Sequence, residues 1–180
     1  MIIEPADPPG VYLIKREPFA DERGLFARVF CRRELEAAGL CGEIAQINLS
    51  TNIRKGTLRG LHSQQGSDAE DKIVTCAAGA VFDVCVDVRE GSATFGRWFG
   101  ETLSAENGHA LYVPKGFAHG YLTLSDNSHV LYFVTQFYKP GAEKGYRFDD
   151  PAFGIVWPLQ PPFIMSGKDR NWEYLNAVNT

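Results

Sequence analysis

The residue types that could carry out proton chemistry gather in two short stretches of this chain. One is residues 59–62 (RGLH), followed by Lys72, and the other is residues 114–120 (PKGFAHG). A histidine exchanges protons near neutral pH, and a lysine supplies a positive charge for a developing anion. These residues lie in strand-like sequence broken by turns, as in a small β-barrel with a polar site in its mouth. We therefore expect an enzyme.

Each histidine also has a more ordinary explanation. A lone histidine is more often a satisfied structural residue than a catalyst. The sequence around His62 favours a catalytic role over a structural one, because the preceding Gly60 permits close backbone approach at a strand or bend. His119 falls in a Pro/Gly-rich turn, the kind of connection in which ligand-contacting side chains collect. We expect His109 and His129 to be surface or turn residues.

The elements that must position these residues are predicted to be strands. The clearest is 80–89, where Phe82, Val84 and Val86 alternate with other side chains at period two. Helical signal is confined to 32–38, ended by Gly39, and to a terminal segment that begins near Ser166. Many short strands favour a sandwich or closed barrel. The other predicted strands are 11–15, 44–50, 73–77, 98–103, 110–113, 120–124 and 130–137.

Size and composition indicate one globular domain spanning residues 1–180. The chain has a mass of 20.0 kDa and is 44% hydrophobic, and a chain of this length buries about 70% of its unfolded surface. No apolar run approaches the ~20 residues needed to cross a bilayer, and the N-terminal residues lack the pattern of a secretory signal. We expect a soluble, cytoplasmic protein without a membrane partner.

The net charge and the cysteine pattern make some classes of function less favoured. A net charge of -4 and a pI near 5.6 argue against nucleic-acid binding, which depends on clustered Lys and Arg. A few local cations can still bind a small anion. The four cysteines include no Cys-x-x-Cys pair, so we expect reduced thiols that are buried or half-buried. They are Cys31, Cys41, Cys76 and Cys85.

A metal site needs testing before proton chemistry, because histidines in a small barrel also suggest a metal-dependent cupin. Such sites commonly use a His-x-His pair with a carboxylate and a further histidine. Here Gln64, a poor ligand for transition metals, stands where the second histidine would be. A metal-free site with His62 as base is favoured. Two roles are compatible with the sequence around Asp83. It is either a solvated or ion-paired surface residue, or a carboxylate that orients a histidine inside the barrel.

Motifs along nearly the whole chain resemble those of the dTDP-4-dehydrorhamnose 3,5-epimerase family. They are residues 21–26 (DERGLF), 46–48 (QIN), 58–62 (LRGLH), 82–89 (FDVCVDVR), 114–120 (PKGFAHG), 149–151 (DDP), 157–158 (WP) and 166–169 (SGKD), with Lys72, Tyr132 and Tyr138 between them. The resemblance implies an all-β cupin-type jelly roll, a double-stranded β-helix with a few short helices. It also implies a homodimer that uses no metal or other cofactor.

The implied reaction is epimerisation of a nucleotide-linked 4-keto-6-deoxyhexose at C3, C5 or both. Protons on these carbons lie alpha to the C4 carbonyl, so they can be removed if the resulting enolate is stabilised. By similarity His62 is the base, oriented by Asp169, and Tyr132 is the acid on the opposite ring face. Lys72 supplies the cation near the C4 oxyanion. His119, paired with Asp83, contacts the sugar or polarises the carbonyl.

Each role has a structural alternative. Asp169 follows Ser166 at the spacing of a helix capping box. Lys72 has the position of a surface lysine at a strand start, and Tyr132 that of an aromatic residue lining a barrel. Seven further positions match substrate-contacting positions of the family. The positively charged side chains among them suit the diphosphate, and Tyr138 suits stacking on the nucleobase. These positions are Arg23, Gln46, Asn48, Arg59, Tyr138, Glu143 and Lys168.

Three departures from the family pattern bear on substrate identity. Arg28 replaces a usual glutamate, and Ser63 replaces an aromatic residue after His62, which is expected to leave a smaller side chain beside the site. Asp71 replaces a neutral residue and is expected to hold Lys72 protonated. A C3-only or C5-only epimerase acting on another nucleotide sugar is therefore an alternative. A catalytically silent sugar-nucleotide-binding cupin is another, disfavoured because binding alone needs no base and acid on opposite faces.

Overall fold

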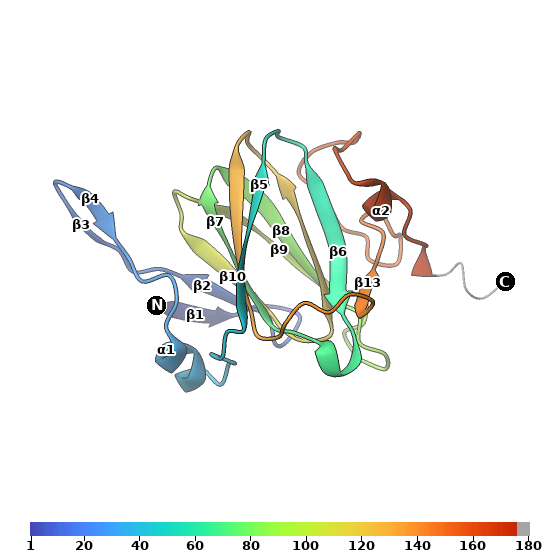
Figure 1. The fold of residues 1–180 in the computed structure, drawn as a ribbon, viewed down its shortest axis with the longest axis horizontal. Coiled ribbons are helices and arrows are strands. Elements are labelled where there is room, and N and C mark those ends of the chain that lie inside the picture. The colour runs from blue at the N-terminus through green and yellow to red at the C-terminus, as the bar shows by residue number, and fades with distance from the viewer. Residues whose placement is uncertain (176–180) are drawn as a thin grey trace.

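Two antiparallel sheets form the body of the protein. The computed structural model describes residues 1–175. One sheet has the order β1-β2-β10-β7-β12-β5, the other β13-β6-β11-β8-β9, and β3 and β4 form a separate hairpin (Figure 1). The strands are β1 (Ile2–Pro5), β2 (Tyr12–Lys15), β3 (Phe19–Asp21), β4 (Gly24–Phe26), β5 (Gln46–Asn52), β6 (Leu58–Gln64), β7 (Lys72–Ala78), β8 (Ala80–Asp87), β9 (Trp98–Ser104), β10 (His109–Val113), β11 (Phe117–Thr123), β12 (Ser128–Val134) and β13 (Glu143–Gly145).

The sheets face each other across a shared core. Its main cluster joins Val74 and Leu111 of the first sheet to Val81, Leu103 and Tyr121 of the second, all fully buried. Strands distant in sequence are neighbours in both sheets, since β10 lies between β2 and β7, and β11 between β6 and β8. This arrangement is the jelly roll of cupins and confirms the predicted all-β fold class.

Helices are few and short in the described part of the chain. They are α1 (Arg32–Ala37), α2 (Gly167–Arg170) and a 3-10 turn, η1 (Gly66–Asp68). The first follows the predicted 32–38 segment, and the second begins directly after Ser166, as predicted. No helix within residues 1–175 is long and apolar enough to cross a membrane. The four cysteines are free, with Cys76 and Cys85 buried and the other two half-buried, as expected.

All eight predicted strands are present, with ends shifted by a few residues. The strand or bend expected around His62 is strand β6, whereas β1, β3, β4 and β13 do not match a predicted strand. The main differences between the predicted and the observed elements concern the histidines. β11 begins at Phe117, so His119 lies within a strand rather than in a turn. His109 and His129 also lie in strands, β10 and β12, and are half-buried.

Close backbone approach brings β6 and β11 together next to the histidines. Gly60 has φ of 116°, and a Cβ at this position would lie 2.7 Å from the Cα of Gly120. A side chain at either glycine would push the strands apart. The register places His119 directly opposite His62, with an irregularity between His119 and Tyr121. The prediction of close approach at Gly60 is confirmed.

Candidate active site

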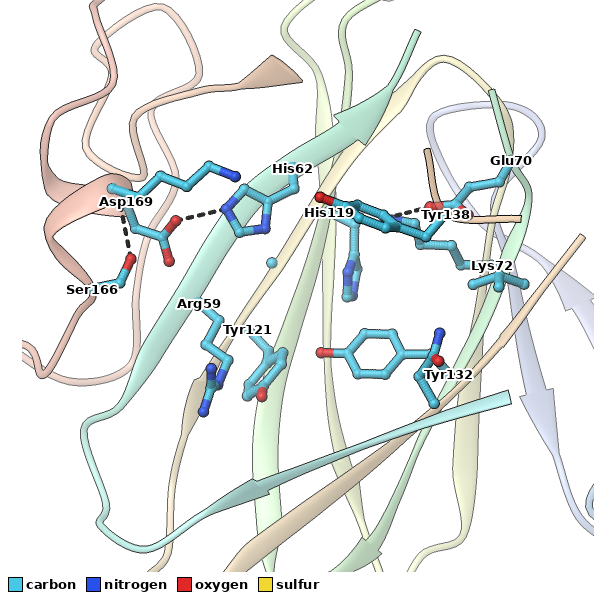
Figure 2. A pocket seen from close by; sticks show the side chains of 14 residues that line it. Arg59, His62, Glu70, Lys72, His119, Tyr121, Tyr132, Tyr138, Ser166 and Asp169 are labelled. Carbon is cyan, nitrogen blue, oxygen red and sulfur yellow. Dashed lines mark hydrogen bonds and ion pairs between the residues drawn. The ribbon is translucent and has the colours of Figure 1, made fainter. Parts of the chain in front are cut away.

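A polar cavity of about 400 Å³ opens between the two sheets and the segment around α2 (Figure 2). β6 and β11 supply one wall, while β5, β7 and β12 supply the other. The cavity is lined by Asn48, Arg59, His62, Glu70, Lys72, His119, Gly120, Tyr121, Tyr132, Val134, Tyr138, Ser166, Lys168 and Asp169. The four residues predicted to be catalytic all line this cavity.

His62 and Asp169 form a close pair across a long sequence separation. The Nε2 atom of His62 lies 2.6 Å from Oδ1 of Asp169, which is 5% exposed. Burial raises the pKa of Asp169, but the hydrogen bond with His62 and the other polar contacts outweigh it and lower the pKa overall. A carboxylate only accepts hydrogen bonds, so Nε2 donates and Nδ1 is left as the basic atom. This arrangement can abstract a proton.

The structure contains a helix cap at Ser166, but the carboxylate of Asp169 is not part of it. Ser166 is the N-cap of α2, and its Oγ accepts a 3.0 Å hydrogen bond from the backbone N–H of Asp169. The carboxylate instead faces His62, and the N–H of Gly60 donates to its second oxygen at 3.4 Å. The cap therefore fixes the backbone of Asp169 while the side chain stays available to the imidazole.

Tyr132 lies across the cavity from His62, and Figure 2 shows its hydroxyl pointing into the space between them. Burial raises the pKa of Tyr132 well above its usual value, the neighbouring Tyr121 raises it further, and Arg59 lowers it only partly. A phenol in this setting keeps its proton until a stronger base, such as an enolate, accepts it. The His119 ring packs edge-on against Tyr132, with 5.9 Å between centroids.

His119 is paired with Asp83, whose burial excludes the solvated alternative for that aspartate. Nε2 of His119 lies 2.9 Å from Oδ1 of Asp83, and the aspartate is fully buried. Burial raises the pKa of Asp83, while His119 and Lys72 lower it in part. Asp83 is thus the carboxylate that orients a histidine. Asp87 instead pairs with Arg89 at 2.7 Å.

The carboxylate beside Lys72 is Glu70, not Asp71. The Nζ atom of Lys72 lies 3.3 Å from Oε1 of Glu70. Asp71 turns to the opposite side, where its Oδ1 accepts a 2.9 Å hydrogen bond from the backbone N–H of Lys115. The expectation that Asp71 holds Lys72 is wrong, because successive residues of extended chain point to opposite sides. The same alternation in the sequence could have identified Glu70.

Most predicted substrate-contacting residues lie at or beside the cavity. Asn48, Arg59, Tyr138 and Lys168 line it. Oε1 of Gln46 accepts a 2.5 Å hydrogen bond from the backbone N–H of Tyr138.

Glu143 lies beside the proposed base. Its Oε1 is 3.6 Å from Nδ1 of His62, and its other oxygen pairs with Lys168. Sequence reasoning missed Trp172, which packs edge-on against His62 at 6.4 Å and lacks a motif signal of its own.

Arg23, by contrast with the other predicted substrate-contacting residues, does not lie at or beside the cavity. It sits on the β3–β4 hairpin, which projects from the body on the opposite side of the molecule from α2 (Figure 1). Its side chain is 85% exposed and pairs with Asp21 at 2.6 Å. Within one chain, Arg23 does not reach the cavity that holds His62.

The other two departures also lie away from the cavity. Arg28 pairs with Glu34 at 2.6 Å. Ser63 is buried, and its Oγ accepts a 2.7 Å hydrogen bond from Gln65. The expectation of a smaller side chain beside the site is wrong, because Ser63 faces the other side of β6 from His62.

The described residues include no group of three His, Cys, Asp or Glu side chains placed to hold a metal ion. Gln64, at the position of a second cupin histidine, has another part in the structure. Its Nε2 donates to the carbonyl of Asp68 at 3.1 Å, and its Oε1 accepts from the backbone N–H of Lys139 at 2.8 Å. Gln64 therefore anchors the loop next to Tyr138.

Comparison with known proteins agrees with this geometry. The profile of the dTDP-4-dehydrorhamnose 3,5-epimerase family matches residues 6–177. The chain belongs to this family. The enzyme of that name from Salmonella typhimurium is 42% identical over 170 residues, covering 94% of this chain and 92% of the relative. The resemblance stated from the sequence motifs is thereby confirmed.

Solved structures extend the comparison. The 3,5-epimerase from Legionella pneumophila in complex with dTDP-4-keto-L-rhamnose has a TM-score of 0.93 and 38% identity, covering 99% of this chain and 94% of that one. A 3'-monoepimerase from Streptomyces bikiniensis in complex with dTDP-quinovose has a TM-score of 0.89 and 31% identity, covering 95% and 86%. Relatives of this fold thus include enzymes with different numbers of inverted centres.

Proposed function

We propose that this protein inverts C3 and C5 of a dTDP-linked 4-keto-6-deoxyhexose by proton removal and return through an enolate. The observation that carries the proposal is the placement of an imidazole–carboxylate pair and a protonated phenol on opposite sides of one cavity. Inversion needs a base and an acid on opposite faces of the sugar ring. Family membership supplies the substrate class.

His62 is the base. Its Nδ1 accepts the proton from the carbon alpha to the C4 carbonyl, and the electron pair of the C–H bond moves into an enolate. Asp169 then stabilises the imidazolium through Nε2. Tyr132 donates its proton to the opposite face of the same carbon, which completes the inversion. The proton taken by His62 returns to solvent, and the tyrosinate takes one up, so the net reaction is an isomerisation.

The cavity also contains the groups that an enolate requires. Lys72 and His119 line the same cavity as the base and the acid, where hydrogen-bond donors act on a partly desolvated oxyanion and contribute several kcal/mol. Asn48, Arg59 and Lys168 have the charge and hydrogen-bonding capacity for the sugar and the diphosphate. Gln46 supports Tyr138, which we assign to stacking on the nucleobase of the substrate. Glu143 lies beside the Nδ1 atom of His62 that accepts the proton.

The remaining candidate, Arg23, fits a homodimer. Its hairpin exposes Phe19 and Phe26, at 78% and 75%, and apolar side chains this exposed are typical of association surfaces. We propose a two-fold dimer in which the hairpin of one subunit brings Arg23 to the cavity of the other. The whole chain then acts as a single catalytic domain, and we place the enzyme in the cytoplasm.

The reaction is proposed to need no metal or other cofactor, because Lys72 and His119 can stabilise the enolate. The purified protein treated with chelator should keep its full rate. Loss of activity that is restored stoichiometrically by one divalent ion would contradict this part of the proposal.

A second candidate is epimerisation at one centre only. It is favoured by the similarity to a 3'-monoepimerase from Streptomyces bikiniensis. Turnover of the dTDP-linked 4-keto-6-deoxyhexose in deuterated water, followed by NMR, distinguishes the two. Deuterium at both C3 and C5 is expected; deuterium at one carbon supports the second candidate, and deuterium at neither contradicts both.

A further inference from the structure

A carboxylate from Glu70 lines the same cavity as the proposed catalytic residues and has no role in the reaction described above. Its Oε1 lies 3.3 Å from Nζ of Lys72, with the two side chains only 11% and 13% exposed (Figure 2). A carboxylate this sheltered is costly unless it is paired. Glu70 is therefore held in the wall by specific contacts.

The second oxygen of Glu70 is also held. Nε2 of Gln64 lies 3.2 Å from Oε2 of Glu70. Gln64 is 4% exposed and is fixed in turn by the backbone of Asp68 and Lys139. The carboxylate thus has a defined orientation, with Lys72 on one oxygen and a buried amide on the other.

Lys72 needs such a partner for the chemistry proposed for it. The lysine side chain is a flexible four-carbon stem that ends in an ammonium with three donors. One donor directed at Glu70 leaves the others free to meet the C4 oxygen of the substrate. A displacement of about 1 Å in a catalytic group can cost ~10²-fold in rate, so the fixed carboxylate determines whether the cation lies where the oxyanion forms.

We propose that Glu70 is a positioning residue that holds the Lys72 ammonium toward the C4 oxygen of the substrate. The proposal rests on the epimerase function given above. Glu70 acts through Lys72 and does not itself exchange protons with the sugar. Its effect should therefore disappear when Lys72 is absent.

The test is a double-mutant cycle on the rate at which substrate hydrogen exchanges for solvent deuterium. We expect Glu70→Ala to lower this rate ~10²-fold, and Glu70→Gln, which keeps the shape and one weaker acceptor, to lower it ~10-fold. In the Lys72→Met background, either change should alter the remaining rate by less than about two-fold. Affinity for dTDP should be retained by Glu70→Gln, which shows that the cavity is intact.

Asp71→Asn is the matched control, because Asp71 is the neighbouring carboxylate on the opposite side of the chain. It should lower the melting temperature and leave the exchange rate within about two-fold of wild type.

Three outcomes would overturn the inference: Glu70→Ala exchanging at the wild-type rate, an equal loss in both backgrounds, or loss of dTDP binding by Glu70→Gln. Equal loss of exchange in Asp71→Asn would also overturn it. Absence of exchange in the wild type would instead contradict the proposed function itself.

Discussion

The imidazole of His62 can act as a base only through the ring nitrogen that lacks a proton. The ionised carboxylate of Asp169 determines which nitrogen this is, because it accepts from Nε2 at 2.6 Å and thereby fixes the tautomer. The contacts that lower the pKa of Asp169 also keep it ionised throughout the neutral range. Base and orienting carboxylate therefore form one functional unit.

His62→Asn and Asp169→Asn should each remove most activity while the fold and dTDP binding persist. The first loses the base, and the second loses the charge that orients the imidazole and stabilises the imidazolium. General-base catalysis contributes about 10²- to 10⁴-fold, so we expect losses of that size in the epimerisation rate measured by NMR. Near-wild-type turnover by either variant would reject the assignment of the pair.

Tyr132→Phe separates proton removal from inversion. The base and Lys72 remain in this variant, so His62 should still take a proton from the substrate. Without an acid on the far face, the enolate should mostly be reprotonated from the side that it left. NMR in deuterated water should then show exchange faster than epimer formation. If the two rates fall equally, Tyr132 is a wall of the cavity and not the acid.

Sequence motifs predict the proposed catalytic residues but not the environment that surrounds them. His62, Lys72, Tyr132 and Asp169 were predicted because their types and order match a family pattern. The sequence points to Asp71 as the partner of Lys72, because the two residues are adjacent along the chain, but the structure pairs Lys72 with Glu70. In an extended segment the neighbour on the same side is two residues away.

At the scale of strands, two glycines determine how the histidines meet. Gly60 on β6 and Gly120 on β11 approach so closely that neither position accommodates a Cβ without displacing backbone. The predicted strands were those with regular alternation, such as β8. For β6, which carries His62, the sequence indicates only a strand or a bend, because Gly60 interrupts its pattern of side chains. Pairing with β11 and β13 compensates for its weak local signal.

The end of β8 contains a polar cluster that stabilises the fold rather than the site. Asp87 is fully buried and accepts hydrogen bonds from Arg89 at 2.7 Å and from Ser92 and Thr94 at 2.6 Å each. Burial raises its pKa, but these donors outweigh burial and lower it well below the usual range. The cluster ties the loop after β8 to the strand.

Asp87→Asn should lower the free energy of unfolding by about 2 kcal/mol at pH 7. A carboxyl group with a lowered folded pKa stabilises fully above its unfolded pKa of about 3.9, and this contribution falls as pH drops below that value. Urea denaturation should show a constant difference from wild type between about pH 7 and pH 5 that shrinks below about pH 4.

The matched control is Asp7→Asn, which removes an exposed ion pair with Arg97 and should change stability by less than about 1 kcal/mol. A difference for Asp87→Asn that persists unchanged at low pH would show that its charge is not the source of stabilisation.

For the whole molecule, two regions of exposed apolar surface bear on association with another chain. One is the projecting hairpin with Phe19 and Phe26, and the other is edge strand β5, where Ile47 and Leu49 are each 60% exposed. Uncovered edge strands with apolar side chains favour pairing with another chain. The motif around Arg23 suggested substrate contact, but sequence alone could not tell which chain's cavity it serves, because that depends on how far the hairpin projects.

Mixing two weakly active variants tests this arrangement. Arg23→Ala and His62→Asn should each be weakly active as homodimers. If the hairpin serves the partner's cavity, a mixed dimer contains one cavity with both lesions and one with neither. Random reassembly of equal amounts should then restore about a quarter of wild-type activity. If Arg23 acts within its own chain, every cavity keeps one lesion and mixing restores nothing. Size-exclusion chromatography of the mixture checks that dimers have formed, and a monomeric wild type would reject the dimer outright.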